Sequence, residues 1–178
     1  LAGQGVLGSA QALAWRVAVA TGATIMGDFV NGRLARGRGR LPIERVPYNT
    51  DLALAALRRF NHIVLVNAKA PVGFFAYPGK PSRHYPSHTQ LHVLSRPDQH
   101  AEAALEALVD AVGAPEVAIP DLGPRPSVAR GTITPEGLAQ TLAALMPEQA
   151  IVIDESVSYG RGFYQHTHAA PPHDWLQL

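Results

Sequence analysis

The stretch His62-Ile63-Val64-Leu65-Val66-Asn67 is the clearest strand in the sequence. Its middle is continuously apolar, and no polar residue alternates with the apolar ones. This pattern is typical of a strand that is covered on both faces, because a strand with one face in water shows a polar residue at every second position. The stretch therefore predicts a parallel sheet with helices on both sides.

On either side of this strand, short apolar runs alternate with segments of helical periodicity. Residues 9–21 have helical spacing and end at Gly22, and residues 23–27 suit a buried strand. Asp51 and Asp98 are expected to cap helices through residues 52–58 and 101–112, with a further strand at 91–94. The alternation predicts an α/β fold with a Rossmann-like doubly wound parallel sheet and flanking helices.

A change in character near residue 120 predicts a domain boundary. Three prolines and a glycine between residues 120 and 126 interrupt every regular pattern, so residues 120–133 are interpreted as a linker after a first domain at 1–119. Residues 117–119 are expected to form an edge strand, and residues 31–40 a loop. Thr134 and Pro135 predict a capped helix start, and residues 151–153 a strand. No later strand is expected, so residues 134–178 are interpreted as a partial second α/β unit.

The composition excludes several classes of protein. The chain has 178 residues, 47% of them hydrophobic, a net charge of +1 and no cysteine. An overall attraction to nucleic acid or to an anionic membrane is therefore excluded, as are disulfides and thiolate nucleophiles. No apolar run approaches the ~20 residues that cross a bilayer. A soluble, cytoplasmic protein is expected, and the start at Leu1, with neither an initiator Met nor a signal peptide, indicates a fragment of a longer chain.

A glycine-rich turn opens the first helix. Gly3, Gly5 and Gly8 match the dinucleotide-binding pattern G-x-G-x-x-G, and Asp28 follows 20 residues later, where a ribose-binding carboxylate would lie. The same glycines would also serve a tight turn without any ligand, and the strand that should precede them is missing from the sequence. A stand-alone NAD-binding domain is therefore the alternative hypothesis, and a turn shaped by chain geometry is favoured.

Two further groups of residues are weighed as candidate sites. Four arginines within residues 33–40 could bind phosphate or nucleic acid, but without an aromatic partner they favour a solvated loop or a subunit contact. Three of the histidines are four residues apart, as on one face of a helix, but Pro86 and the strand expected at His92 argue against that helix. The other three lie in a proline-containing tail without carboxylates at ligand spacing, so neither group is expected to bind a metal. The four arginines are Arg33, Arg36, Arg38 and Arg40, and the histidines are His84, His88, His92, His166, His168 and His173.

A polar loop follows the strand at residues 151–153. Such a loop, at the carboxyl end of a strand, is where α/β sheets bind ligands. Asp154 and Glu155 could serve acid–base chemistry, and Ser156 and Ser158 could hold a phosphate group. Asp and Ser are equally common as helix N-caps, so both interpretations remain open here.

Several stretches taken together resemble thiamine-diphosphate-dependent enzymes of the acetolactate synthase and benzoylformate decarboxylase group. The resemblance covers nearly the whole chain and implies the central, Rossmann-like domain of that family, followed by the start of its pyrophosphate-binding domain. The stretches that carry it are residues 71–82 (PVGFFAYPGKPS), the helix start Thr134-Pro135-Glu136, residues 151–156 (IVIDES) and His173-Asp174-Trp175-Leu176.

The resemblance implies a parent enzyme that uses thiamine diphosphate and Mg²⁺ to decarboxylate or ligate 2-oxoacids, as a homo-oligomer. The family's Gly-Asp-Gly motif and its activating Glu are absent, so this fragment is expected to be inactive alone, to have a structural role, and to hold no metal or catalytic residue. Glu155, Ser156 and Ser158 stand at positions that contact the cofactor diphosphate or its surroundings; Val157 departs from the family's hydroxyl residue. FAD, which acetolactate synthases bind, has no specific match here.

Overall fold

The computed structural model describes residues 1–29 and 31–177, and within it the chain forms two compact units. Unit 1 comprises Leu1–Asn31 and Ile43–Pro115, and unit 2 comprises Gly32–Pro42 and Glu116–Leu178. The chain therefore leaves unit 1 for a short excursion into unit 2 and returns. These units are defined by contacts within the chain. The boundaries predicted from the sequence, a first domain that ends at residue 119 and a second that begins at residue 134, stay a prediction.

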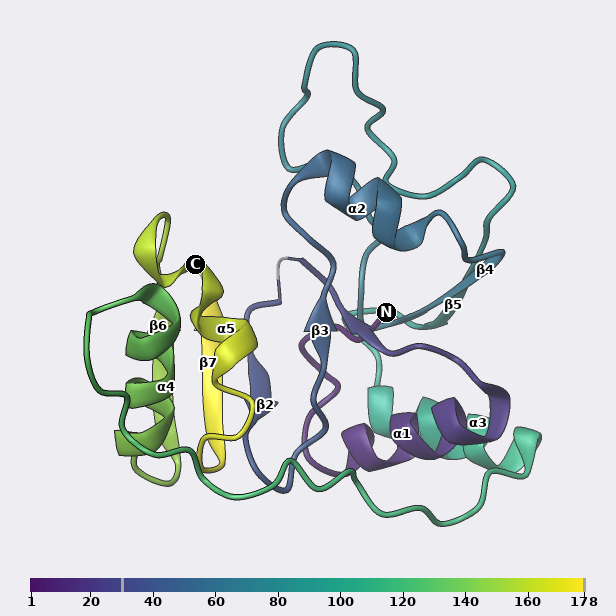
Figure 1. The fold of residues 1–178 in the computed structure, drawn as a ribbon. Coiled ribbons are helices and arrows are strands. Elements are labelled where there is room, and N and C mark those ends of the chain that lie inside the picture. Colours follow the sequence, from purple (N-terminus) through teal and green to yellow (C-terminus); the bar gives the residue numbers. More distant parts are fainter. Residues whose placement is uncertain (30, 178) are drawn as a thin grey trace. The chain divides into compact units, whose positions relative to one another are not determined.

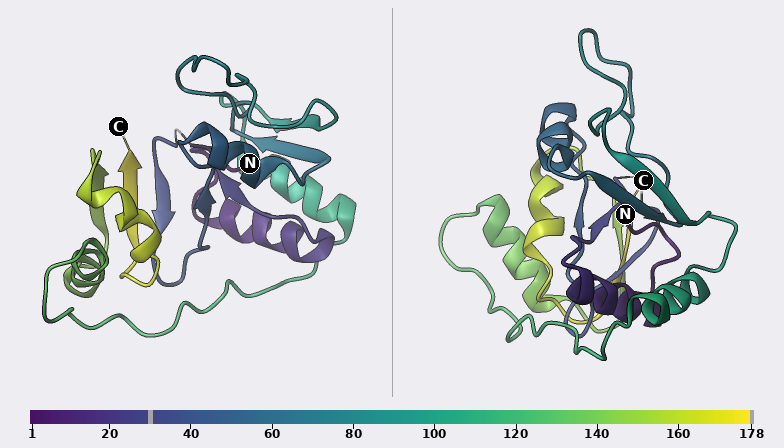
Figure 2. Two further views of the ribbon diagram at one scale, coloured as in Figure 1. Left: turned by 45° about the horizontal axis from the view of Figure 1, so that its top comes forward. Right: turned by 90° about the vertical axis from the view of Figure 1, so that its right-hand side faces the viewer.

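Unit 1 is a parallel sheet between two layers of helices (Figure 1). Helices α1 and α3 lie side by side on one face and α2 lies on the other, as the views of Figure 2 agree. Its elements are α1 (Ser9–Thr21), β1 (Met26–Gly27), β3 (Glu44–Arg45), α2 (Thr50–Leu57), β4 (His62–Val66), β5 (Gln90–Ser95) and α3 (Ala101–Val112).

The centre of this sheet is made by the first residues of the chain. Ala2 pairs in parallel with Gly27 on one side and with Val66 on the other, so the order across the sheet is β3, β1, the Leu1–Gly3 segment, β4 and β5. This is the order of a doubly wound sheet, in which the chain reverses direction beside its first strand. The expected Rossmann-like fold is confirmed, and the strand thought to be missing before the glycine turn is present as a short segment.

Unit 2 is a small mixed sheet with helices on one face. Strand β7 lies in the middle, antiparallel to β2 and parallel to β6. Leu34, Tyr164 and Trp175 form a buried cluster against the helices. The elements are β2 (Leu34–Arg36), α4 (Pro135–Leu145), β6 (Ala150–Asp154), a 3₁₀ turn η1 (Tyr159–Gly162), α5 (Phe163–His166) and β7 (His173–Gln177).

Five local predictions are wrong. Residues 34–36 form β2 although 31–40 were expected to be a loop, and His173–Gln177 forms β7 although no strand was expected there. Both strands depend on partners far away in the sequence, which local periodicity does not report. Residues 117–119 are not a strand. Finally, α2 is capped by Asn49, whose side chain accepts from two backbone N–H groups, and the residue before α3 is His100; neither expected Asp cap forms.

The capped start of α4 is confirmed. Thr134 Oγ1 accepts from the N–H of Gly137 at 3.0 Å, and Pro135 occupies the first helical position. Among the described residues the longest helix, α1, has 13 residues, and none is long and apolar enough to cross a membrane.

Candidate functional site

The glycine turn of unit 1 lies where doubly wound sheets bind their ligands, at the carboxyl end of the central segment. Asn67, which follows β4, packs directly against it. A Cβ on Gly3 would lie 1.8 Å from the carbonyl oxygen of Asn67, and a Cβ on Gly5 would lie 1.7 Å from its Oδ1. The two glycines are therefore required for the close approach of a protein side chain and backbone, which supports a turn shaped by chain geometry.

Asn67 is held in this position by a buried network. Its Nδ2 donates to Ser95 Oγ at 3.3 Å, to the carbonyl of Gln99 at 3.1 Å and to the carbonyl of Arg96, and its backbone N–H donates to the carbonyl of Ser95 at 2.9 Å. Its φ of 50° lies in the left-handed region, which Asn tolerates better than most residues. The network connects the ends of β4 and β5 to the start of α3 beneath the turn.

Asp28 does not stand free at the end of β1. Its carboxylate accepts from the backbone N–H groups of Lys69 and Phe29, and burial raises its pKa above the ordinary value despite these bonds. A carboxylate in this arrangement connects the end of β1 to the segment after β4. The geometry around Asp28 and Asn67 thus gives the NAD-binding alternative no support.

The raised pKa of Asp28 predicts how stability changes with pH. Below the ordinary pKa of Asp the carboxyl is protonated in both states; as the pH rises through the raised pKa, ionisation favours the unfolded chain. Asp28→Asn should therefore raise the urea midpoint at pH 7, with a gain that shrinks as the pH is lowered below about 4. The control is Asp98→Asn, at an exposed carboxylate of the same unit, which should leave the urea midpoint unchanged both at pH 7 and below pH about 4. A gain that persists at low pH would contradict the assignment.

The arginine-rich stretch does not form one basic patch. Arg36 lies buried in β2, with its guanidinium 3.5 Å from the ring centroid of Tyr164. Arg33 makes an exposed ion pair with Asp174 at 2.8 Å, and Arg38 is exposed. The interpretation of these residues as a solvated loop is therefore wrong for Arg36, whose short strand pairs with β7.

The histidines are likewise dispersed. His84 is buried in the long connection before β5, while His88 and His92 are exposed. His92 instead approaches His62 on the neighbouring strand, with 3.1 Å between Nε2 and Nδ1. Within residues 1–29 and 31–177, no group of three or more His, Asp or Glu side chains could hold a metal ion.

The polar loop of unit 2 begins where β6 ends. Asp154 turns back on it: Oδ1 accepts from the N–H of Ser156 at 2.9 Å and from its hydroxyl, while Oδ2 accepts from the indole N–H of Trp175 at 3.2 Å. Gly160 packs against the loop, since a Cβ there would lie 2.6 Å from Cβ of Ser156. Asp154 is thus held by hydrogen bonds that shape the loop.

The outer side of this loop offers hydrogen-bond donors to solvent. Glu155, Ser156, Val157 and Ser158 are exposed, and the backbone N–H groups of Val157 and Ser158 donate to no acceptor within the described part of the chain. Free backbone N–H groups together with a nearby hydroxyl can bind an anionic oxygen. Ser156 differs from Ser158, because its hydroxyl is already engaged by Asp154. Of the two serines predicted as candidate ligands, Ser158 is therefore the one whose hydroxyl is available to a bound group.

Arg161 was missed in the sequence. It lies in η1 next to the loop, is exposed, and donates through Nε to the carbonyl of Val157. A positive charge three residues after Ser158 was visible, but nothing in the local pattern showed that the chain turns back at Tyr159–Gly162 and brings it to the loop.

Comparisons with known proteins agree with this geometry. No family model matches the chain. The protein "Putative acetolactate synthase large subunit IlvX" of Mycobacterium tuberculosis is 41% identical over 179 residues, which covers 100% of this chain and 34% of that protein. A thiamine diphosphate-dependent 4-hydroxybenzoylformate decarboxylase of Rhodococcus jostii RHA1 superposes with a TM-score of 0.65 at 18% identity, over 95% of this chain and 35% of that one.

The two comparisons carry different weight. At 18% identity the decarboxylase shows a shared fold alone, whereas 41% identity along the whole chain shows common descent. The chain spans about a third of the length of the relative it matches. Over its whole length, the chain is thus similar in sequence to about a third of an acetolactate synthase large-subunit-type protein.

Proposed function

We propose that this chain is the central-domain part of a thiamine-diphosphate-dependent 2-oxoacid decarboxylase or carboligase that resembles acetolactate synthase. The observation that carries the proposal is the 41% identity to an acetolactate synthase-type protein over the full length of the chain. In this proposal residues 1–119 are the central domain, 120–133 a linker, and 134–178 the start of the pyrophosphate-binding domain. The parent is a cytoplasmic homo-oligomer.

The loop after β6 fits a diphosphate group in part. Ser158 Oγ and the neighbouring backbone N–H groups supply donors, and Arg161 supplies a positive charge nearby. Glu155 brings a negative charge to the same loop. This charge would repel a diphosphate unless a cation lay between the carboxylate and the diphosphate. Glu155, Ser156 and Ser158 would therefore line the surroundings of the diphosphate, while Mg²⁺ and most of the cofactor would be held by other parts of the parent.

The role of the chain in this proposal is structural. Thiamine diphosphate, held in the parent with Glu155, Ser156 and Ser158 in its surroundings, would supply the carbanion chemistry by which 2-oxoacids are decarboxylated or ligated. The residues of this chain position the loop. The carboxylate of Asp154 accepts from the N–H of Ser156, and Gly160, which has no Cβ, leaves room for the Ser156 side chain. Alone, the chain binds neither thiamine diphosphate nor FAD measurably and has no activity; its partners are the remaining domains of the parent.

Calorimetry and turnover assays test this proposal. The 178-residue chain should release no heat with thiamine diphosphate and Mg²⁺, or with millimolar NAD, and should not turn over pyruvate. In the parent protein, Ser158→Ala should raise the Kd of thiamine diphosphate about tenfold, as expected for one hydrogen bond to a charged group. Ser87→Ala, an exposed serine of unit 1, is the matched control. Turnover by the chain alone, or equal affinities for the two variants, would argue against the proposal.

A further inference from the structure

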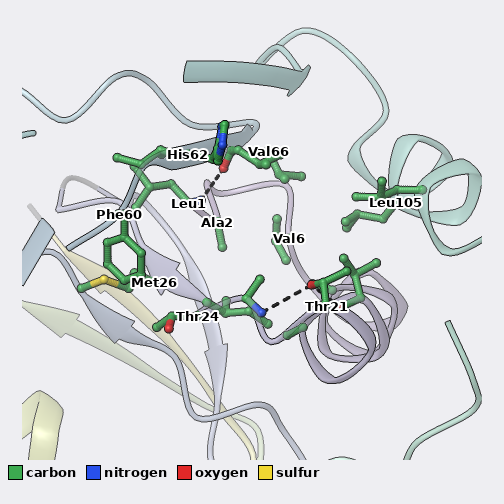
Figure 3. A pocket seen from close by; sticks show the side chains of 18 of the residues that line it. Leu1, Ala2, Val6, Thr21, Thr24, Met26, Phe60, His62, Val66 and Leu105 are labelled. Carbon is green, nitrogen blue, oxygen red and sulfur yellow. Dashed lines mark hydrogen bonds between the residues drawn. The ribbon is translucent and has the colours of Figure 1, made fainter. Parts of the chain in front are cut away.

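Two histidines of unit 1 meet across its neighbouring strands β4 and β5. Nδ1 of His62 lies 3.1 Å from Nε2 of His92, and the two ring centroids are 5.3 Å apart. Both side chains are exposed. Figure 3 shows His62 from the side of an apolar pocket that it borders. The pair joins β4 to β5, whereas the Leu1–Gly3 segment pairs with β4 on its other side.

The sheet holds the two histidines at this distance. In the β4–β5 register, His62 pairs with Gln90 and Val64 pairs with His92. The two histidines are therefore offset by two residues, and because residues two apart on a strand point to the same face, both rings lie on one face of the sheet. Their backbone positions belong to a regular ladder, so only the side-chain torsions can change. Secondary structure, and not a loop, thus presents the two rings as a pair.

The separation of the two nitrogens fits a shared metal ion as well as a shared proton. Without a metal, one ring donates its N–H and the other accepts, because two N–H groups cannot point at each other. A Zn–N bond is about 2.0–2.1 Å long, so two nitrogens 3.1 Å apart subtend an angle of about 95–102° at the ion. This angle lies between about 90° for square-planar and about 109° for tetrahedral coordination. A metal ion can therefore take the place of the proton, which moves to the other nitrogen of its ring or to solvent.

The donor set selects the kind of ion. Neutral imidazole nitrogens suit Cu²⁺, Zn²⁺ and Ni²⁺, whereas Mg²⁺ and Ca²⁺ prefer oxygen ligands. In the part of the chain that the structure describes, no third His, Asp or Glu side chain completes a cluster with these two. Water would therefore fill the remaining positions, and an open site of this kind should bind Cu²⁺ more tightly than Zn²⁺.

We propose that His62 and His92 together bind one divalent transition-metal ion, Cu²⁺ or Zn²⁺, which bridges β4 and β5 while water completes its coordination. The bound ion ties the edge strand β5 to β4 and stabilises unit 1, because it binds the folded arrangement of the two rings. The two histidines are 30 positions apart, so no local spacing in the sequence indicates the pair. This inference does not rest on the function proposed above.

The probes are CuCl₂, ZnCl₂ and MgCl₂, titrated by calorimetry at about pH 7.5 into the 178-residue chain without a histidine tag. One Cu²⁺ should bind per chain with a Kd below about 10 µM, Zn²⁺ should bind more weakly, and Mg²⁺ should give no saturable heat. Electron paramagnetic resonance at one equivalent of Cu²⁺ should show coupling to two imidazole nitrogens. Saturating Zn²⁺ should raise the urea midpoint of the wild type but not that of His92→Gln.

Four variants separate this site from scattered binding to single histidines. His62→Gln and His92→Gln should each raise the Kd of Cu²⁺ at least about tenfold, because the loss of a ligand costs at least as much as the loss of a partner that orients one. His88→Gln in unit 1 and His166→Gln in unit 2, both at exposed histidines, are the controls and should change the Kd less than about twofold. The absence of saturable Cu²⁺ binding, a Cu²⁺ signal from a single nitrogen, or equal weakening by all four substitutions would overturn the proposal.

Discussion

Gly3→Ala is expected to destabilise unit 1 by at least about 4 kcal/mol, which is within the range that unfolds many domains. The added Cβ would lie 1.8 Å from the carbonyl oxygen and 2.3 Å from the carbonyl carbon of Asn67, so backbone would have to move. Gly5→Ala should be comparably harmful in the wild-type chain, because its Cβ meets Oδ1 of Asn67 at 1.7 Å. Urea denaturation, with hydrogen exchange to localise the loss, measures both.

A second substitution at Asn67 should rescue the Gly5→Ala variant but not the Gly3→Ala variant. The obstacle at Gly5 is a side chain, so in an Asn67→Gly background, where the left-handed φ is tolerated, Gly5→Ala should cost less than about 1 kcal/mol. The obstacle at Gly3 is backbone, and its cost should persist. Gly8→Ala is the control: nothing lies within 4 Å of its added Cβ, and only the backbone conformation, with φ 52° and ψ −123°, should cost about 1–3 kcal/mol. A Gly3 variant no worse than this control would refute the packing argument.

Arg36→Ala is expected to destabilise unit 2 by about 3 kcal/mol. The buried guanidinium stacks on Tyr164 and lies 4.8 Å from the ring centroid of Trp175. It also donates to Thr167 Oγ1 at 3.2 Å and to the carbonyl of Tyr164. Its removal takes away both of these hydrogen bonds and opens a cavity between β2 and α5. The urea midpoint followed by circular dichroism measures the loss.

Arg36→Lys tests whether charge alone is enough. An ammonium keeps the charge but cannot lie flat on Tyr164 while it donates to two separated acceptors, so about 2 kcal/mol should still be lost. Arg38→Ala, two residues away and exposed, should change stability by less than about 0.5 kcal/mol. If Arg36→Lys proved as stable as the wild type, the planar stacking argument would fail.

Most elements of unit 1 were predictable because they have a local signal, whereas β3 and the Leu1–Gly3 segment of the sheet were not predicted. The apolar run at His62–Val66, the helical spacing of Ser9–Thr21 and the glycine stop at Gly22 depend on neighbours within a few residues. The loop at residues 155–158 was predictable as a candidate site for a similar reason, since it follows a strand. Its internal structure was not, because the roles of Gly160 and Arg161 depend on how the chain turns after Ser158.

Local pattern was thus sufficient for the α/β class and for most helices and strands, whereas the enzyme family was suggested by the resemblance of several stretches to known proteins. Tertiary structure alone decided the pairing of β2 with β7, the burial of Arg36 and the place of Asn67 within the glycine turn. These features join residues that are far apart, such as Arg36 and Thr167, which are 131 positions apart in the sequence. Periodicity records which face of a segment is apolar, but the segment that covers that face is chosen only when the whole chain packs.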